Sequence, residues 1–451
     1  CLYGFTYHAV FEGFFMRVFG LGFLLSLLAA ALVACDLSGE SVSTGLATPE
    51  ANVIDADLAF VGAAVVTMTD QRVLEAQTVL VSDGTIIAIG PVGEIAFSDS
   101  ATIVPAEGRY LIPGLADMHV HANEPGFLDL FVANGVTLVR NMWGSPQHLE
   151  WRELIEGGRM LGPRIVTAGA LVDGVPQIWE DSIGLEDAES AFVEMDAQID
   201  AGYDFIKIYS RLPIEAYRAI MERSKETGFP FGGHVPNSVA IEDAMRDGMR
   251  SIEHLTGWDA ATATTGSEFE IALAGGDSFA RMSFLVPVAE QLDSGAIAWN
   301  DVIDPARREA LAALAAETGV WNVPTLVVLD RANPSRRQGE VRLREPGMQY
   351  IAPAVRISWD PSSNPFLSGR SDDQIETLQV FFDEALARVK ALNDAGAGIL
   401  AGTDTPNPWV VPGFSLHQEL ELLVEAGLSP YDALAAATTA PAEFLNDDSI
   451  G

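Results

Sequence analysis

Residues 113–121 read PGLADMHVH, and this stretch decides which fold the rest of the chain is expected to adopt. Side chains alternate along a β-strand, so Asp117, His119 and His121 would share one face, and apolar residues would occupy the other. Two imidazoles at positions i and i+2 on one face can bind a single metal ion. The stretch therefore predicts a buried strand with metal ligands at its carboxyl end.

Short apolar runs alternate with longer helical segments after Gly114. The eight runs lie at 115–121, 136–141, 164–169, 204–209, 230–235, 251–255, 320–328 and 398–404, with helical candidates such as 186–201, 213–227 and 238–248 between them. This alternation predicts an α/β fold, specifically a (β/α)8 TIM barrel over residues 114–445, with catalytic groups at the carboxyl ends of the strands. The helix-rich gap at 256–319 is long enough to cover an active site. Residues 53–113 are β-rich and punctuated by Gly, Asp and Pro, which predicts part of a small β-sandwich domain.

A lysine stands in the middle of one apolar run, DFIKIYS at 204–210, although the whole chain has only three lysines. Alternation puts Phe205, Lys207 and Tyr209 on the inward face. A charged ammonium beside a divalent metal would be costly to bury. A neutral amine, with its pKa lowered by burial, can instead react with carbon dioxide to give a carbamate anion that bridges two metals. The alternative is a structural lysine paired with a carboxylate.

Four of the seven histidines and one aspartate stand at the ends of the apolar runs, in motifs that resemble a known family. PGLADMHVH, FIKIYS, GGHVP, SIEHLTG and AGTDTP are similar to the amidohydrolase superfamily, and nearest to its imidazolonepropionase-like and binuclear prolidase-like branch. The resemblance runs from about residue 58 onward. It implies two divalent metal ions, most suitably zinc, and N6-carboxylysine at Lys207 formed from carbon dioxide.

The resemblance also assigns roles residue by residue. The implied metal ligands are His119, His121 and Asp404 for one ion, His234 and His254 for the other, and carboxylated Lys207 between the two. The implied chemistry is attack of a metal-bridging hydroxide on an amide carbonyl, with Asp404 and His254 as catalytic residues and Asp404 passing the proton to the leaving nitrogen.

Three further residues are candidates for supporting roles. Asp117 is expected to orient the ligands from behind, or to be structural at the floor of the barrel. Arg140 is a candidate clamp for a substrate carboxylate, with an ion pair inside the barrel as its alternative. Tyr209 is a candidate substrate contact, or a packing residue.

Three functional interpretations remain open from the sequence. The first is a binuclear hydrolase of small-molecule amide or dipeptide C–N bonds. The second is a mononuclear hydrolase of cyclic amidines or lactams, or a deaminase, and Lys207 argues against it because that branch generally lacks a bridging lysine. The third is a metal- or solute-binding lipoprotein without catalysis. Metal content distinguishes the first two, and retention of Asp404 argues against the third.

The two ends of the sequence carry expectations of their own. Residues 1–15 precede Met16 and are interpreted as a leader outside the natural protein. Residues 16–35 resemble a lipoprotein signal peptide whose lipobox ends at Cys35, the expected lipidation site, and 36–52 are a small-residue tether. Asp36 resembles the signal that keeps some lipoproteins in the inner membrane. Bacterial cell-envelope anchoring at the periplasmic face is thus expected. Family members continue with strands that return to the β domain, so 446–451 are interpreted as the truncated start of that return.

Composition excludes several partner classes. The chain has 63 acidic and 26 basic residues, a formal net charge of −37, which argues against nucleic acid and against a polybasic lipid-binding face. The only cysteines are Cys1 and Cys35, so the globular part has no disulfide framework and no thiolate metal site. A small-molecule substrate is the expected partner, and a homo-oligomer is compatible with the sequence.

Overall fold

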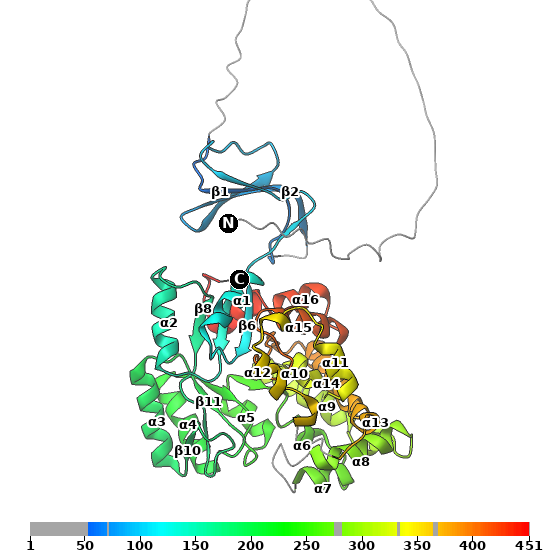
Figure 1. Ribbon diagram of the computed structural model, residues 1–451. Coiled ribbons are helices and arrows are strands. Elements are labelled where there is room, and N and C mark those ends of the chain that lie inside the picture. The colour runs from blue at the N-terminus through cyan, green and yellow to red at the C-terminus, as the bar shows by residue number, and fades with distance from the viewer. Residues whose placement is uncertain (1–52, 70–71, 275–281, 332–333, 364–368, 451) are drawn as a thin grey trace, which may run out of the picture. The chain divides into compact units, whose positions relative to one another are not determined.

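The computed structural model describes residues 53–69, 72–274, 282–331, 334–363 and 369–450 (Figure 1). The chain divides into two units, Cys1–Asn52 and Val53–Gly451, and the described residues all belong to the second. The predicted leader, signal peptide, tether and lipidation site at Cys35 lie outside them. Over the described ranges, no helix combines the length and apolar character needed to span a bilayer.

The first strands form a five-stranded mixed sheet. They are β1 (Leu58–Val66), β2 (Val73–Ser82), β3 (Thr85–Pro91), β4 (Thr102–Pro105) and β5 (Tyr110–Leu111), in the order β3-β2-β1-β4 with β5 also paired to β1. Ala59, Ala63, Val79 and Leu80 are buried along β1 and β2. The described part of residues 53–113 forms this one sheet, and the second layer of the expected β-sandwich stays a prediction.

The remaining strands are parallel and fall into two sheets. β6 (Leu115–Val120), β7 (Val136–Asn141) and β8 (Arg164–Thr167) form one. The other has the order β10-β9-β11-β12-β13-β14 and contains β9 (Val172–Gly174), β10 (Ile183–Leu185), β11 (Ile206–Ile208), β12 (Phe231–Gly233), β13 (Ser251–Glu253) and β14 (Trp321–Val323). The predicted α/β class with parallel strands is confirmed. The pairings of the described strands do not form a closed barrel, and β9 and β10 lie outside the eight apolar runs.

Two of the predicted strands differ from expectation for local reasons. The run 320–328 stops being a strand at Val323, because Pro324 has no N–H to donate and Thr325 adopts a φ of 48°. Helix α10 (Leu326–Arg331) starts directly afterwards. The run 398–404 contributes only a single bridge, from Ile399 to Asn322, and Thr405 directly after it forms another with Val120.

The helices occupy the connections between the parallel strands, and α2, α3 and α4 run along the outside of these strands in Figure 1. The three helical segments proposed from the sequence correspond to α3 (Ala188–Ala201), α4 (Ile214–Thr227) and α5 (Ile241–Asp247). The others are α1 (Pro125–Ala133), α2 (Pro146–Glu156), α6 (Trp258–Thr262), α7 (Glu268–Ala274), α8 (Met282–Asp293), α9 (Pro305–Thr318), α11 (Arg336–Arg342), α12 (Pro353–Ser358), α13 (Asp372–Glu376), α14 (Gln379–Ala395), α15 (Phe414–Glu425), α16 (Pro430–Ala435) and α17 (Thr439–Leu445), with 3-10 turns at Trp299–Asp301, Met348–Tyr350 and Pro361–Ser363.

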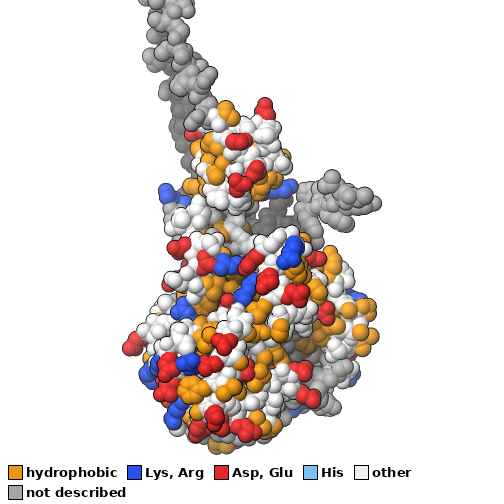
Figure 2. Space-filling view, turned by 90° about the vertical axis from the view of Figure 1, so that its left-hand side faces the viewer, with side chains coloured by type: hydrophobic (Ala, Val, Ile, Leu, Met, Phe, Trp, Pro, Cys, Tyr) orange, Lys and Arg blue, Asp and Glu red, His pale blue; other side chains and the backbone are white. Residues whose placement is uncertain are grey.

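The main core lies between these helices and the parallel strands. Ile206 and Ile208 of β11 are fully buried and belong to the same apolar cluster as Ala216 and Ile220 of α4. On the face shown in Figure 2, acidic side chains are spread over the surface with basic ones among them. Burying apolar side chains at roughly 1.5–3 kcal/mol each gives the strands a rigid backing, from which polar side chains can be held at their carboxyl ends.

Candidate active site

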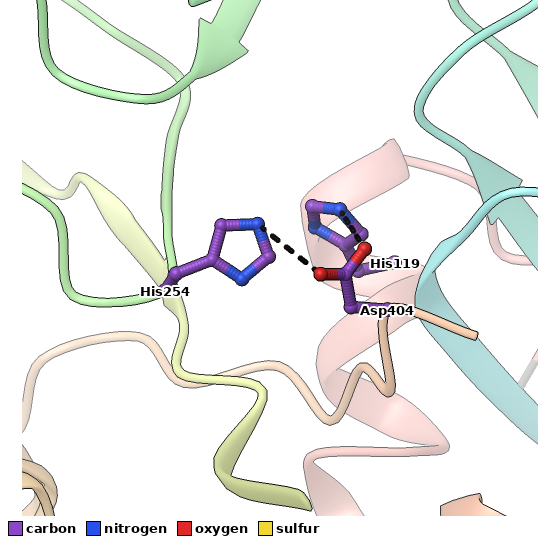
Figure 3. Close-up of side chains that lie close together, drawn as sticks. All are labelled: His119, His254 and Asp404. Carbon is purple, nitrogen blue, oxygen red and sulfur yellow. Dashed lines mark ion pairs between the residues drawn. The ribbon is translucent and has the colours of Figure 1, made fainter. Parts of the chain in front are cut away.

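Asp404 lies at the centre of a cluster of histidines. One carboxylate oxygen, Oδ1, lies 3.0 Å from Nε2 of His121 and 3.3 Å from Nε2 of His119. The other, Oδ2, lies 3.9 Å from Nε2 of His254 (Figure 3). His119, His254 and Asp404 each offer a ligand atom within 4.8 Å of the others. Residues from an early and a late part of the sequence are thus brought to one point.

The backbone presents two of these side chains in unusual conformations. His254 has a φ of 57°, Leu255 a φ of 54° and Asp404 a φ of 61°, all in the left-handed region that non-glycine residues seldom occupy. Such conformations cost about 1–3 kcal/mol each and are concentrated at functional sites. At His254 the left-handed turn ends strand alternation, which lets Glu253 and His254 both serve the same interior site.

Glu253 is buried and connects His119 to Arg140. Its Oε2 lies 2.7 Å from Nδ1 of His119, and its Oε1 accepts hydrogen bonds from Nη2 of Arg140 at 2.7 Å and from Oγ of Ser251 at 2.6 Å. Burial alone would raise the pKa of Glu253, but the positive charge of Arg140 and the hydrogen bond to His119 lower it below its usual range. An ionised Glu253 accepts the Nδ1 proton of His119 and so leaves Nε2 free to face Asp404.

Two more of the candidate histidine ligands, His254 and His234, are also oriented through their Nδ1 atoms. Nδ1 of His254 lies 2.7 Å from Oγ1 of Thr325, and Nδ1 of His234 lies 2.9 Å from Oγ of Ser210. Burial lowers the pKa of His254 to about 3 and holds the pKa of His234 well below its usual value. These imidazoles are therefore neutral at physiological pH, which is the state that binds a metal.

Lys207 is 1% exposed, and its Nζ makes no hydrogen bond to any described residue. Burial lowers the pKa of this amine to about 8. Space for its side chain depends on Gly233, where φ is 137° and a Cβ atom would lie 2.8 Å from Cδ of Lys207. The amine of Lys207 can therefore lose its proton near neutral pH. Among the described residues, no carboxylate is hydrogen-bonded to its Nζ.

The donor set fits a divalent cation. Four buried polar atoms of this site have no hydrogen-bond partner among the described residues: Nε2 of His119, Nδ1 of His121, Nζ of Lys207 and Oδ1 of Asp404. Burial favours the neutral acid of Asp404, yet His254 and His119 hold its pKa well below the usual range, so it is an anion. A buried anion among imidazoles whose nitrogens have no other partner is the arrangement that Zn²⁺ and similar ions require.

Arg140 does not have the role proposed from the sequence. Its guanidinium is buried and donates to the carbonyl of Met118 at 2.7 Å, to Oγ of Ser251 at 3.0 Å and to Glu253 at 2.7 Å. All three nitrogens are therefore engaged by the protein itself, and a substrate carboxylate would have to displace a buried ion pair. This corrects the prediction of a substrate clamp in favour of its alternative, an internal ion pair.

Asp117 and Tyr209 lie beside the cluster. Asp117 accepts hydrogen bonds from Oγ1 of Thr403 at 2.7 Å and from the Thr403 amide at 3.0 Å, which fixes the turn that carries Asp404. The ring of Tyr209 lies 3.9 Å from that of His234, and its hydroxyl accepts a hydrogen bond from Nε1 of Trp179 at 3.0 Å. Asp117 therefore contacts the turn that carries Asp404, and Tyr209 contacts the ring of His234.

Sequence reasoning missed several residues of the site. Glu253 directly precedes His254, and strand alternation would put these two neighbours on opposite faces. Trp143 and Trp179 form an aromatic wall, with Trp143 6.3 Å from His121 and 6.5 Å from Trp179 between ring centres. A tryptophan directly after a strand and another in a connection are the only sequence signals for this wall.

Comparison with known proteins begins with the fold. The structure aligns with that of a bottromycin amidohydrolase at a TM-score of 0.64 and 25% identity, over 86% of this chain and 78% of the other. It aligns with a Xaa-Pro dipeptidase crystallised with bound methionine at a TM-score of 0.56 and 17% identity, over 87% of this chain and 90% of the other. The fold and the histidine–aspartate cluster define the class of amidohydrolase-like proteins.

Sequence relatives point the same way. A 123-residue stretch is 34% identical to adenine deaminase of Deinococcus deserti, and a 48-residue stretch is 48% identical to dihydroorotase of Mycobacterium tuberculosis. The matched stretches cover 25% and 11% of this chain and span only 21% and 11% of those relatives. No family model matches. The chain is thus similar to amidohydrolases in fold and, over short stretches, in sequence, as its motifs predicted.

Proposed function

We propose that the protein is a metal-dependent hydrolase of amide or dipeptide C–N bonds in small molecules. The observation that carries the proposal is the convergence of buried polar atoms without partners from His119, Lys207 and Asp404, within the described part of the chain. The solved structures similar in fold include a bottromycin amidohydrolase and a Xaa-Pro dipeptidase, which supports a C–N bond as the target.

The residues divide into two sets of ligands in this proposal. His119, His121 and Asp404 hold one divalent ion, and His234 and His254 hold the other. Lys207, carboxylated by carbon dioxide, would be the ligand shared by the two ions, and zinc suits all of these donors. The ions would supply a lowered pKa for an attacking water and polarisation of the substrate carbonyl.

The chain's own groups handle orientation and the proton. Glu253 and Thr325 fix the tautomers of His119 and His254, so that both Nε2 atoms point at the carboxylate of Asp404. Asp404, ionised at neutral pH, takes the proton of the attacking water and delivers it to the leaving nitrogen. His254, the other catalytic candidate, has its Nε2 3.9 Å from Oδ2, beyond hydrogen-bond distance, and would act as a metal ligand beside it.

We further propose that the parallel strands close into the (β/α)8 barrel expected from the sequence. Single bridges support closure: Ala168 to Phe205 joins the two parallel sheets, and residues Ile399 and Thr405 bridge β14 and β6 from opposite sides. Closure would put the carboxyl ends of all eight segments around one mouth, where the candidate ligands lie.

The test is a hydrolysis screen with the zinc-loaded full-length chain, using N-acyl amino acids and Xaa-Pro dipeptides. Turnover with about two zinc equivalents per chain is expected. Asp404→Asn should abolish turnover and leave most of the metal bound. Absence of turnover over a broad amide and ester panel, with metal bound, would favour the third interpretation, a binding lipoprotein.

A mononuclear deaminase or lactam hydrolase is the second candidate. It is favoured by the 34% identical stretch of adenine deaminase and by the compact group of His119, His254 and Asp404, which alone satisfies one ion. One metal equivalent per active chain, together with ammonia release from aminopurines, would select this candidate over the first.

We also propose that Cys35 anchors the protein by a lipid at the periplasmic face of a bacterial membrane. The lipobox LVAC at 32–35 and the tether after it support this. Cells expressing the full chain should incorporate labelled palmitate into it, and Cys35→Ser should not be labelled. Label retained by Cys35→Ser would reject the anchor.

A further inference from the structure

A pocket of about 220 Å³ opens beside His254, on the side of that residue formed by the helices that follow β13 and β14. Seven of its lining residues are apolar or aromatic and come from α7, α8, α13, α14 and the turn before α14: Phe269, Leu285, Ile375, Leu378, Phe381, Phe382 and Ala385. Drug-sized ligands occupy pockets of roughly 300–1,000 Å³, so this volume suits one side group and not a whole ligand.

The apolar walls are firmly supported. The rings of Phe269 and Phe381 stack at 5.9 Å with an interplanar angle of 14°, and Trp299 meets Phe381 edge-on at 6.1 Å. Phe269 belongs to a separate apolar cluster formed with residues of α8 and the segment before α9. The pocket is therefore a built cavity, with its shape held by packing that does not involve the candidate metal ligands.

The charged residues of the lining are already paired with other protein groups. Arg388 lies 2.7 Å from Asp259, Asp330 lies 2.9 Å from Arg342, and Glu376 lies 2.8 Å from Arg337. The guanidinium of Arg388 is held by a carboxylate, so no open cation awaits a substrate anion there. With three carboxylates against one guanidinium in the lining, the pocket disfavours a negatively charged group.

We infer that this pocket is the specificity site for an uncharged aromatic or large aliphatic group on one side of the scissile bond. The inference rests on the proposed function and adds a substrate class to it. Contact of the pocket with His254 and Leu255 sets the accepted group next to the reacting centre. The substrate class is then an amide or dipeptide with a Phe- or Leu-like side group, rather than a glycyl or acidic one.

Kinetics with a substrate series tests this. Gly, Leu, Phe and Asp are varied at each side of the amide separately, with the zinc-loaded full-length protein. At one of the two positions, kcat/KM for Phe should exceed that for Gly by at least about tenfold, and that for Asp should fall below Gly. Ala385→Phe fills the pocket and should bring the Phe/Gly ratio close to 1. Ala395→Phe, at an exposed position on the same helix, should keep the wild-type ratio and activity.

Binding of an uncleavable probe separates this inference from the proposed function. The probe 2-(4-fluorophenyl)ethanol, followed by ¹⁹F NMR, should bind wild type and Ala395→Phe but not Ala385→Phe. Leu378→Trp replaces Ala385→Phe if that variant does not fold. If the pocket-filling substitutions abolish probe binding while the wild type hydrolyses no amide, the pocket assignment stands and the proposed function is rejected. If a folded Ala385→Phe protein keeps the wild-type Phe/Gly ratio, or still binds the probe, the pocket is not the specificity site.

Discussion

Glu253 and His119, 134 positions apart in the sequence, share a 2.7 Å hydrogen bond in the interior, and Arg140 holds the other oxygen of the same carboxylate at 2.7 Å. We expect Glu253→Gln to weaken zinc binding about 10–100-fold, because the neutral amide no longer enforces the His119 tautomer. It should also lower the free energy of unfolding by about 3–5 kcal/mol, since Arg140 loses its partner. Calorimetric zinc titration well below the melting temperature and thermal denaturation measure the two effects. Unchanged zinc affinity would contradict the assigned role.

Lys207→Met should reduce the bound metal from two equivalents to one and lower kcat at least about a hundredfold. The reason is loss of the only bridging group proposed between the two ions. Metal content by mass spectrometry and steady-state kinetics provide the readouts. Lys225→Met, at an exposed position on α4, is the matched control and should retain both properties. Two retained metal equivalents in the Lys207 variant would rule out the bridging carbamate.

Glu419 predicts a pH-dependent stability. Its carboxyl group is buried against the amides of Leu326 and Val327, and burial raises its pKa from 4.5 to about 8. Between these values the folded chain holds a proton that the unfolded chain releases, so this group makes stability fall as pH rises from about 4.5 to 8. Glu419→Gln removes that dependence.

Melting temperatures of the wild type and Glu419→Gln at pH values between about 5 and 8.5 measure this effect. The difference between the two proteins should move in favour of the variant as pH rises. Glu421→Gln, exposed on the same helix, should follow the wild type throughout. Parallel curves for wild type and Glu419→Gln would show that Glu419 does not titrate in this window.

Gly233→Ala should destabilise the fold by about 3 kcal/mol or more and disturb Lys207. The new methyl group would lie 2.3 Å from the carbonyl oxygen of Ile208 and 2.8 Å from Cδ of Lys207. Gly202→Ala is the control, because Gly202 also has a positive φ, but a methyl group added there would meet no heavy atom within 4 Å. Denaturant unfolding compares them, and equal losses would show that backbone strain alone accounts for the effect.

The sequence predicted most of the parallel strands because these lie in apolar runs, but it missed β9 and β10, which are only three residues long. PGLADMHVH shows its ligand pattern directly, because His119 in β6 and His121 directly after it both reach Asp404. The same rule failed at Glu253, where the left-handed φ of His254 interrupts alternation in a way that the letters SIEHL do not reveal.

Contacts between residues far apart in the sequence, such as Arg140 and Glu253, could not be predicted from the sequence either. Arg140 could face either substrate or protein from its place at the end of β7, and only the position of Glu253 decides between them. The proposed specificity pocket is lined by helices from separate parts of the chain, and its walls depend on how these helices pack. Residues such as Phe381 show ordinary helical spacing, which predicts burial without predicting a cavity.

The backbone amide of Asp404 is hydrogen-bonded to the carbonyl of His119 at 2.7 Å, so the centre joins an early part of the polypeptide to a late one. During translation, a ribosome must add well over two hundred residues after the first imidazole before the carboxylate emerges. Ion capture at this centre would therefore mark a chain whose synthesis has passed Asp404, and would distinguish it from shorter nascent products.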